Sequence, residues 1–89
     1  MENTNGENMI ILDSARKHGI SDRDMRFIIS NPYIVLKLKG GRKKYLHLGF
    51  DSNARALEVI TDIGEYGQIY VIHADKITKE NEKRLKEVL

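Results

Sequence analysis

The chain contains no cysteine and no tryptophan, and it has a single proline in 89 residues. The absence of cysteine excludes disulfides and thiolate metal sites, so folding does not depend on an oxidising compartment. No apolar run approaches the roughly 20 residues that a membrane-spanning helix requires. Residues 1–8 are polar and acidic, unlike a secretory signal. We therefore expect a flexible tail over residues 1–8 and a cytoplasmic protein without membrane association.

Basic residues outnumber acidic ones more strongly outside this tail. The formal net charge is +2, from 15 Lys and Arg against 13 Asp and Glu, and two of the acids, Glu2 and Glu7, lie in the tail. Residues 9–89 therefore hold 15 bases against 11 acids, or +4. Between positions 37 and 44 five bases follow one another without an acid, namely Lys37, Lys39, Arg42, Lys43 and Lys44. This cluster favours a polyanion such as RNA, although lysines on an exposed hairpin also protect a sheet edge from aggregation.

The hydrophobic pattern predicts a single α+β domain over residues 9–89, built on a four-stranded antiparallel meander sheet. Alternating apolar and polar residues predict strands over 33–39, 45–50, 55–62 and 69–74. Apolar residues at helical spacing predict two short helices before the sheet, over 10–18 and 21–31, and one after it, over 77–89. Gly40-Gly41 predicts a hairpin turn between the first two strands.

Polar residues mark the starts and ends of the predicted helices. Ser21 with Asp24 three residues later predicts the start of the second helix. Asn31-Pro32 predicts its end, because the residue before proline is driven out of the helical region. Thr78 is the predicted cap of the last helix, with Asn81 three residues later.

The motifs of the common catalytic sites are missing. Gly40-Gly41 lies between two predicted strands, whereas a phosphate-binding loop joins a strand to a helix. The three histidines, at positions 18, 47 and 73, are too scattered to predict a metal centre, so we expect no cofactor. The residue types still available for catalysis are His, Lys, Arg and Tyr. They suit metal-independent RNA cleavage by the 2′-hydroxyl, in which a base and an acid move protons and cations stabilise the phosphorane.

Three segments of the sequence follow a recognisable order. They are Arg16-Lys17-His18-Gly19-Ile20-Ser21, the run from Tyr45 to Val59 and the run from Ile72 to Glu80. Together they resemble the BrnT-type toxins of bacterial type II toxin–antitoxin systems. The resemblance covers roughly residues 16–84. It implies a RelE-like ribonuclease toxin, with a small antiparallel sheet flanked by helices. It also implies mRNA as substrate, in solution or on the ribosome, and a partner antitoxin with a ribbon-helix-helix domain.

The resemblance also identifies candidate site residues. Arg55 matches the family arginine that follows the turn after the second strand, while Lys76 and Thr78 match a lysine and a threonine of the final motif. Two positions depart from the family, since its serine is replaced by His73 and its arginine by Asp75. An anion beside a scissile phosphate weakens stabilisation of the transition state. This departure leaves open a protein that binds RNA without cutting it.

The predicted catalytic residues are Arg55, His73 and Lys76. Arg55 and Lys76 are predicted to hold the phosphate, because guanidinium in particular binds phosphate in a bidentate way. His73 is predicted to move a proton, as its ordinary pKa near 6.5 allows. This assignment requires the three side chains to face the same side of the domain. Each also has a structural alternative, as a packed strand-end histidine or as a surface cation.

Two further residues are weaker candidates. Tyr45 and His47 alternate with Leu46 and Leu48, so they lie on the other face of the second strand and join the site only if that face is a substrate groove. His18, next to Gly19, is interpreted as a helix C-terminal residue that interacts with the helix dipole.

Two functions from different classes therefore remain. The first is a metal-independent mRNA-cleaving toxin that an antitoxin neutralises. The second is a non-catalytic module, either a relic of a toxin or an adaptor, that binds protein or nucleic acid through its basic hairpin or a sheet edge. The ordered matches around Arg55 and Lys76 favour the first function, and Asp75 favours the second.

Overall fold

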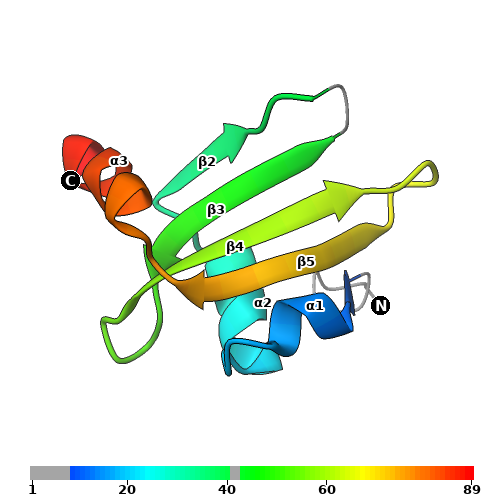
Figure 1. Cartoon of the computed structure of the whole chain (residues 1–89), viewed down its shortest axis with the longest axis horizontal. Helices are drawn as coiled ribbons and strands as arrows, with labels where there is room; N and C mark the ends of the chain where they lie inside the picture. The colour runs from blue at the N-terminus through cyan, green and yellow to red at the C-terminus, as the bar shows by residue number, and fades with distance from the viewer. Residues whose placement is uncertain (1–8, 41–42) are drawn as a thin grey trace.

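The computed structural model describes residues 9–40 and 43–89 of the chain. These residues form one five-stranded sheet and three helices, a mixed α+β fold (Figure 1). The elements in chain order are β1 (Met9–Ile11), α1 (Asp13–Arg16), α2 (Asp22–Ser30), β2 (Ile34–Lys37), β3 (Lys44–Phe50), β4 (Ala56–Ile63), β5 (Ile69–Lys76) and α3 (Lys79–Val88). The strand order is β1-β5-β4-β3-β2, and the predicted tail over residues 1–8 lies outside the described residues.

Strands β2 to β5 form the predicted antiparallel meander, but the sheet has a fifth strand that the sequence pattern missed. Met9–Ile11 pairs in parallel with Ile69–Val71 of β5, where we expected the first turn of a helix. Helix α1 is correspondingly reduced to Asp13–Arg16. The parallel partner lies some sixty residues further along the chain, so local helical spacing gave no indication of it. The prediction of a four-stranded, purely antiparallel sheet is therefore wrong in this detail.

Helices α1 and α2 pack on the same face of the sheet, as Figure 1 shows. Ala15, Met25 and Ile28 from these helices contact the apolar residues of β4 and β5 that point to this face, which are Leu57, Val59, Val71 and Ala74. Helix α2 lies close to β3 at Gly49, where an added Cβ would stand 3.4 Å from the carbonyl oxygen of Asn31. A glycine at this position permits the close approach of helix and strand.

Helix α3 covers only one end of the opposite face of the sheet (Figure 1). Its buried Leu85 packs against Leu46 and Leu48 of β3, with apolar residues of β2 and the start of β4 around them. Farther along this face, Ile60 of β4 and His73 of β5 are only half-buried. We call this part of the sheet surface the open face, defined by Lys44, Ile60, Asp62, Tyr70 and His73.

The predicted helix caps are confirmed. The side-chain oxygen of Ser21 accepts a hydrogen bond from the backbone N–H of Asp24 at 3.1 Å, and α2 begins at Asp22. The side-chain oxygen of Thr78 accepts one from the backbone N–H of Asn81 at 3.3 Å, and α3 begins at Lys79. Helix α2 ends at Ser30, just before Asn31-Pro32. These local signals act through neighbouring backbone groups, so the sequence alone reveals them.

Candidate functional site

A buried glutamate lies at the edge of the open face. Glu58 of β4 stands between Leu57 and Val59, and its side chain is only 6% exposed. Its neighbours Leu57 and Val59 point to the face covered by α1 and α2, so Glu58 points to the other face. A carboxylate this deeply buried must be satisfied by hydrogen bonds or charge.

Glu58 is fully engaged by groups of β5 and α3. Its Oε1 accepts hydrogen bonds from the backbone N–H of Thr78 at 2.8 Å and from Nδ2 of Asn81 at 3.0 Å, and its Oε2 lies 3.0 Å from Nε2 of His73. Burial alone would raise the pKa of Glu58, but the hydrogen bonds from Asn81, Thr78 and His73 outweigh burial and hold that pKa below its ordinary value of 4.5. Glu58 is therefore a carboxylate at neutral pH, and it can only accept hydrogen bonds.

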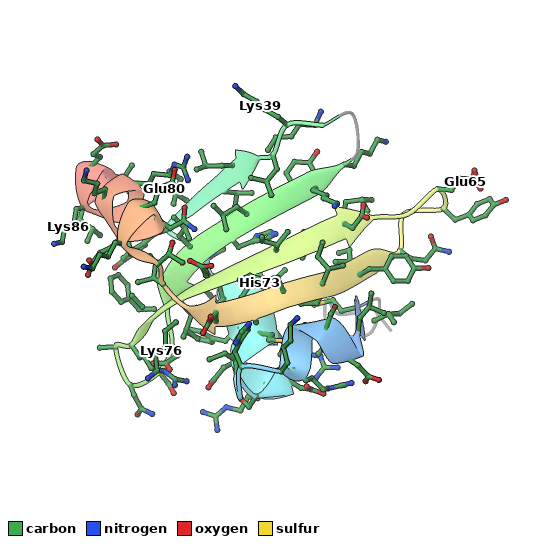
Figure 2. The ribbon with its side chains drawn as sticks, viewed as in Figure 1. Lys39, Glu65, His73, Lys76, Glu80 and Lys86 are labelled. Atoms are coloured by element: carbon green, nitrogen blue, oxygen red, sulfur yellow. The ribbon has the colours of Figure 1, made fainter. Side chains whose placement is uncertain are left out.

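This carboxylate fixes the protonation pattern of His73. Because Glu58 Oε2 can only accept, the Nε2 atom of His73 must donate, which places the lone pair of the neutral imidazole on Nδ1. His73 lies opposite Ile60 on the open face, and its side chain is 30% exposed (Figure 2). The ring is therefore oriented by a buried anion while it remains accessible to a molecule on the sheet. This arrangement is that of a general base held by a carboxylate.

A second histidine lies against the first. The rings of His18 and His73 meet edge to face, with centroids 5.7 Å apart. Nδ1 of His18 is 3.6 Å from Oδ2 of Asp75. We call the four residues Glu58, His73, His18 and Asp75 the histidine cluster. It contains one imidazole beside a buried carboxylate and another beside a half-buried one.

Two features of the loop between α1 and α2 place His18. Gly19 has a φ of +78°, a left-handed conformation that favours glycine, and it turns the chain directly after His18. Arg16 bridges the two helices, because its Nε and Nη2 donate to the two carboxylate oxygens of Asp22 at 3.0 and 2.8 Å. The short loop is thus held at both ends. The interpretation of His18 as the C-terminal residue of a helix is wrong. Helix α1 ends at Arg16, and the ring of His18 instead contacts His73 of β5.

The structure does not bring Arg55 to His73, which corrects the predicted catalytic group. Arg55 belongs to the turn before β4, where its Nε donates to Asp51 Oδ2 at 2.9 Å and its Nη2 lies 3.5 Å from Asp24 Oδ2. Asp24 is part of α2, which covers the face opposite to His73. Backbone and side-chain hydrogen bonds from Arg55 lower the pKa of Asp51, although burial opposes them. Arg55 therefore stabilises the turn before β4, and the charge of its guanidinium is neutralised by Asp51 and Asp24.

Lys76 is also separated from His73. It is the last residue of β5 and pairs with Leu57, which points to the face covered by α1 and α2. Residues directly opposite one another share a face, so Lys76 and His73 project from opposite sides of the sheet. Figure 2 shows Lys76 at the end of the strand and His73 over the sheet. The requirement that Arg55, His73 and Lys76 face one side is not met, and this three-residue site is wrong.

Tyr45 and His47 lie on the covered face and form no substrate groove. His47 is buried opposite Val59, and its Nε2 is 3.0 Å from the hydroxyl oxygen of Thr61. Its Nδ1 is buried and has no hydrogen-bond partner in the described part of the chain. Burial lowers the pKa of His47, because a protonated Nδ1 would be a buried donor without an acceptor. Tyr45 pairs with the buried Thr61 on the same face.

The buried imidazole predicts a loss of stability in mild acid. The pKa of His47 is lower in the folded than in the unfolded chain, so below about pH 6.5 the unfolded chain binds more protons and the free energy of unfolding falls, by at most about 1.4 kcal/mol per pH unit. Urea unfolding of the wild type and of His47→Gln between pH 7.5 and 5 measures this slope. The variant is expected to show a smaller slope, and an equal slope would contradict the assignment.

The predicted RNA-binding bases do not share one face. Lys37 pairs with Tyr45 on the covered side, whereas Lys44 pairs with Asp62 on the open face. Lys39 and Lys43 are exposed near the hairpin end, with Lys39 labelled in Figure 2, and Arg42 lies outside the described residues. Of the described bases in this cluster, Lys44 therefore borders the open face directly.

Sequence reasoning missed Glu58 and His18 as site residues. Glu58 did carry a signal, because an acid within the apolar run Leu57-Glu58-Val59-Ile60 of a central strand is costly unless it is paired. His18 lies in the segment from Arg16 to Ser21 that resembles the toxins, but its contact with His73 joins segments 55 residues apart, and the sequence pattern gave no indication of that contact. Within residues 9–40 and 43–89, no cluster of three or more His, Asp or Glu side chains is arranged to hold a metal ion.

Comparison with protein-family models gives no match for this chain, and comparison with curated proteins gives none either. Function must therefore be argued from the geometry of the histidine cluster. No helix in the described residues is long and apolar enough to cross a membrane.

Proposed function

We propose that the chain is a metal-independent endoribonuclease of the toxin type, with its reaction centre at the histidine cluster on the open face. The observation that supports this proposal is the pair of imidazoles, 5.7 Å apart, one of which is held by the buried carboxylate of Glu58. Cleavage of RNA by its own 2′-hydroxyl needs a base and an acid on opposite sides of one phosphate, and two histidines supply both near neutral pH.

The two histidines have different roles in this proposal. Neutral His73 accepts the 2′-hydroxyl proton at Nδ1, while Glu58 stabilises the imidazolium that forms through its contact with Nε2. His18, in its imidazolium form, donates a proton to the leaving 5′-oxygen. The P–O bond to the 2′-oxygen forms as the bond to the 5′-oxygen breaks, so the products end in a 2′,3′-cyclic phosphate and a 5′-hydroxyl. A later proton exchange with water restores both imidazoles.

The open face provides a place for the RNA strand. Ile60 and Tyr70 are half-buried and lie beside His73, so they offer apolar and aromatic surface on which a base can stack. Lys44 stands in the same cross-strand row as Tyr70, with Asp62 between them, and Lys39 and Lys43 extend from the hairpin beyond it. We propose that these lysines attract the phosphate backbone and guide it toward the histidine cluster.

The toxin context and the partner rest on the BrnT resemblance. The resemblance supports an mRNA substrate, in solution or on the ribosome, and an antitoxin with a ribbon-helix-helix domain that neutralises the chain by covering the open face. In this context, induced expression of the chain without the partner is expected to arrest bacterial growth.

The experiment that tests the proposal is cleavage of single-stranded RNA by the purified full chain in the presence of a metal chelator. The expected products carry 2′,3′-cyclic phosphate and 5′-hydroxyl ends. A substrate of the same sequence with 2′-O-methyl groups serves as the matched control and is expected to stay intact, because its 2′-oxygen has no proton to lose. A folded chain that cuts no RNA, alone or with translating ribosomes, would overturn the proposal.

The second candidate function is a non-catalytic binding module. One observation favours it: Arg55, the cation expected at the phosphate, is neutralised by Asp51 and Asp24, and Asp75 places a negative charge beside His18. The module would bind RNA through the same open face without cutting it. Tight binding of RNA with no cleavage under any of these conditions would support this function.

A further inference from the structure

Within residues 9–40 and 43–89, no strand pairs with the outer edge of β2, so this edge can pair with another strand. β2 is the last strand of the sheet, next to β3 alone. The N–H of Leu38 donates to the carbonyl oxygen of Lys44 at 2.8 Å. This hydrogen bond, together with the register of β2 and β3, determines which residues of β2 direct their backbone N–H and C=O groups toward β3. By the alternation of an antiparallel ladder, the backbone groups of Ile34 and Leu36 point toward β3, and those of Val35 and Lys37 point away from the sheet.

This edge is also apolar at its centre. Val35 is 45% exposed, and Tyr33, just before β2, is 61% exposed with its ring edge to face against Phe50 of β3. Soluble proteins usually protect an edge strand with charges, prolines or a covering segment. Along β2 the charge of Lys37 lies at one end, and the middle position is valine. Exposed apolar surface and unpaired backbone groups thus coincide on one edge.

The sequence of β2 is complementary to itself in antiparallel register. If two copies pair with Val35 facing Val35, Ile34 of each copy lies opposite Leu36 of the other. No like charges face each other in this register, and apolar positions meet apolar positions. A shift that places Leu36 opposite Leu36 of the second copy puts the apolar Val35 opposite the charged Lys37. We propose that two copies of the chain pair along β2, so that two five-stranded sheets form one continuous sheet of ten strands.

This pairing has a geometric consequence and a limit on its strength. A two-fold axis perpendicular to the sheet keeps the same face of both copies on one side, so the two open faces lie on the same side of the ten-stranded sheet. The inference does not depend on RNA cleavage, since it rests on the edge alone. β2 has only four residues, and its seam is smaller than the roughly 1,000 Å² of a stable interface. We therefore expect a weak dimer, with a Kd on the order of 10–100 μM.

Sedimentation of the full chain over a concentration series around this Kd tests the proposal. The wild type is expected to pass from monomer to dimer. Val35→Pro removes an N–H that points away from β3, so it is expected to fold and to stay monomeric. Val35→Lys places like charges opposite each other and is expected to weaken the dimer at least tenfold. Ile10→Lys alters an equally exposed apolar residue on β1, at the opposite edge of the sheet, and is the matched control that still dimerises.

A cysteine crosslink locates the contact. Val35→Cys places two sulfurs across the two-fold axis, in a hydrogen-bonded pair whose Cα atoms lie about 5.5 Å apart, within disulfide range. The chain has no other cysteine, so mild oxidation of the Val35→Cys variant is expected to give a covalent dimer. The Tyr66→Cys variant, with its cysteine on a distant exposed turn, is expected to give much less covalent dimer. A wild type that stays monomeric at several hundred micromolar (well above a Kd of about 100 μM) would overturn the proposal. Equal dimerisation of wild type and Val35→Pro, or equal crosslinking of the two cysteine variants, would also overturn it.

Discussion

Replacing His73 with alanine is expected to lower the rate of RNA cleavage by about 100- to 10,000-fold, the range that a positioned general base contributes. The expected effect on stability is small, below about 1.5 kcal/mol, since His73 is partly exposed and Glu58 keeps its hydrogen bonds from Thr78 and Asn81. Single-turnover cleavage and urea unfolding at pH 7 separate the two effects. A large loss of activity in a folded variant identifies chemistry at His73.

Arg55→Ala is the contrasting variant. Arg55 is bound to Asp51 and Asp24 on the other side of the domain, so its loss is expected to loosen the turn before β4 and to change cleavage only a few-fold. His18→Ala is expected to lower the rate as His73→Ala does and to remove the limb of the pH–rate profile that reports the acid. A folded His73→Ala variant with the wild-type rate, or an Arg55→Ala variant that loses all activity, would contradict the histidine cluster as the reaction centre.

Replacing Glu58 with glutamine is expected to affect both folding and cleavage. The glutamine side chain has one acceptor oxygen where the glutamate has two, so its NH₂ group must face either the donors Thr78 and Asn81 or Nε2 of His73. The first orientation leaves buried donors unpaired and costs about 1–3 kcal/mol. The second forces the proton of His73 onto Nδ1, which removes the base and lowers cleavage by up to about 10,000-fold.

The pH dependence of stability gives this prediction an independent readout. The folded pKa of Glu58 lies below 4.5, so the wild type gains stability from the carboxylate above that pH and loses it as the pH falls through the folded pKa. Glu58→Gln is expected to show a flatter acid limb in urea unfolding. Glu80→Gln, on the exposed surface of α3, is the matched control. A Glu58→Gln variant with wild-type stability, cleavage rate and acid limb would contradict a positioning role for Glu58.

Much of the fold could be predicted because its signals are local. Ser21 and Thr78 cap helices through backbone groups three residues away, and the alternation along β3 and β4 reflects which side chains the two faces bury. β1 could not be predicted in this way. Its three residues form a strand because β5 offers a parallel partner, and the same apolar residues fit a helical turn when read locally.

The candidate site was predicted only in part, for the same physical reason. His73 was chosen for its chemistry and its place at a strand end, and it lies at the centre of the histidine cluster. Arg55 was chosen because guanidinium binds phosphate well, but its nearest anions are Asp51 and Asp24 of the protein itself. The local sequence does not show which partner a charged group will meet. Glu58 and His18 join His73 through the sheet and the α1–α2 loop, contacts that only the fold creates.

The most direct test of the site is the response of the three histidines to bound RNA. The ring C–H signals of His18, His47 and His73 can be followed by NMR while a 2′-O-methyl oligonucleotide, which cannot be cleaved, is added to the full chain. His18 and His73 are expected to shift together, with His47 unchanged because it is buried on the covered face. Binding that leaves His18 and His73 unmoved, or no binding at all, would contradict RNA recognition at the histidine cluster.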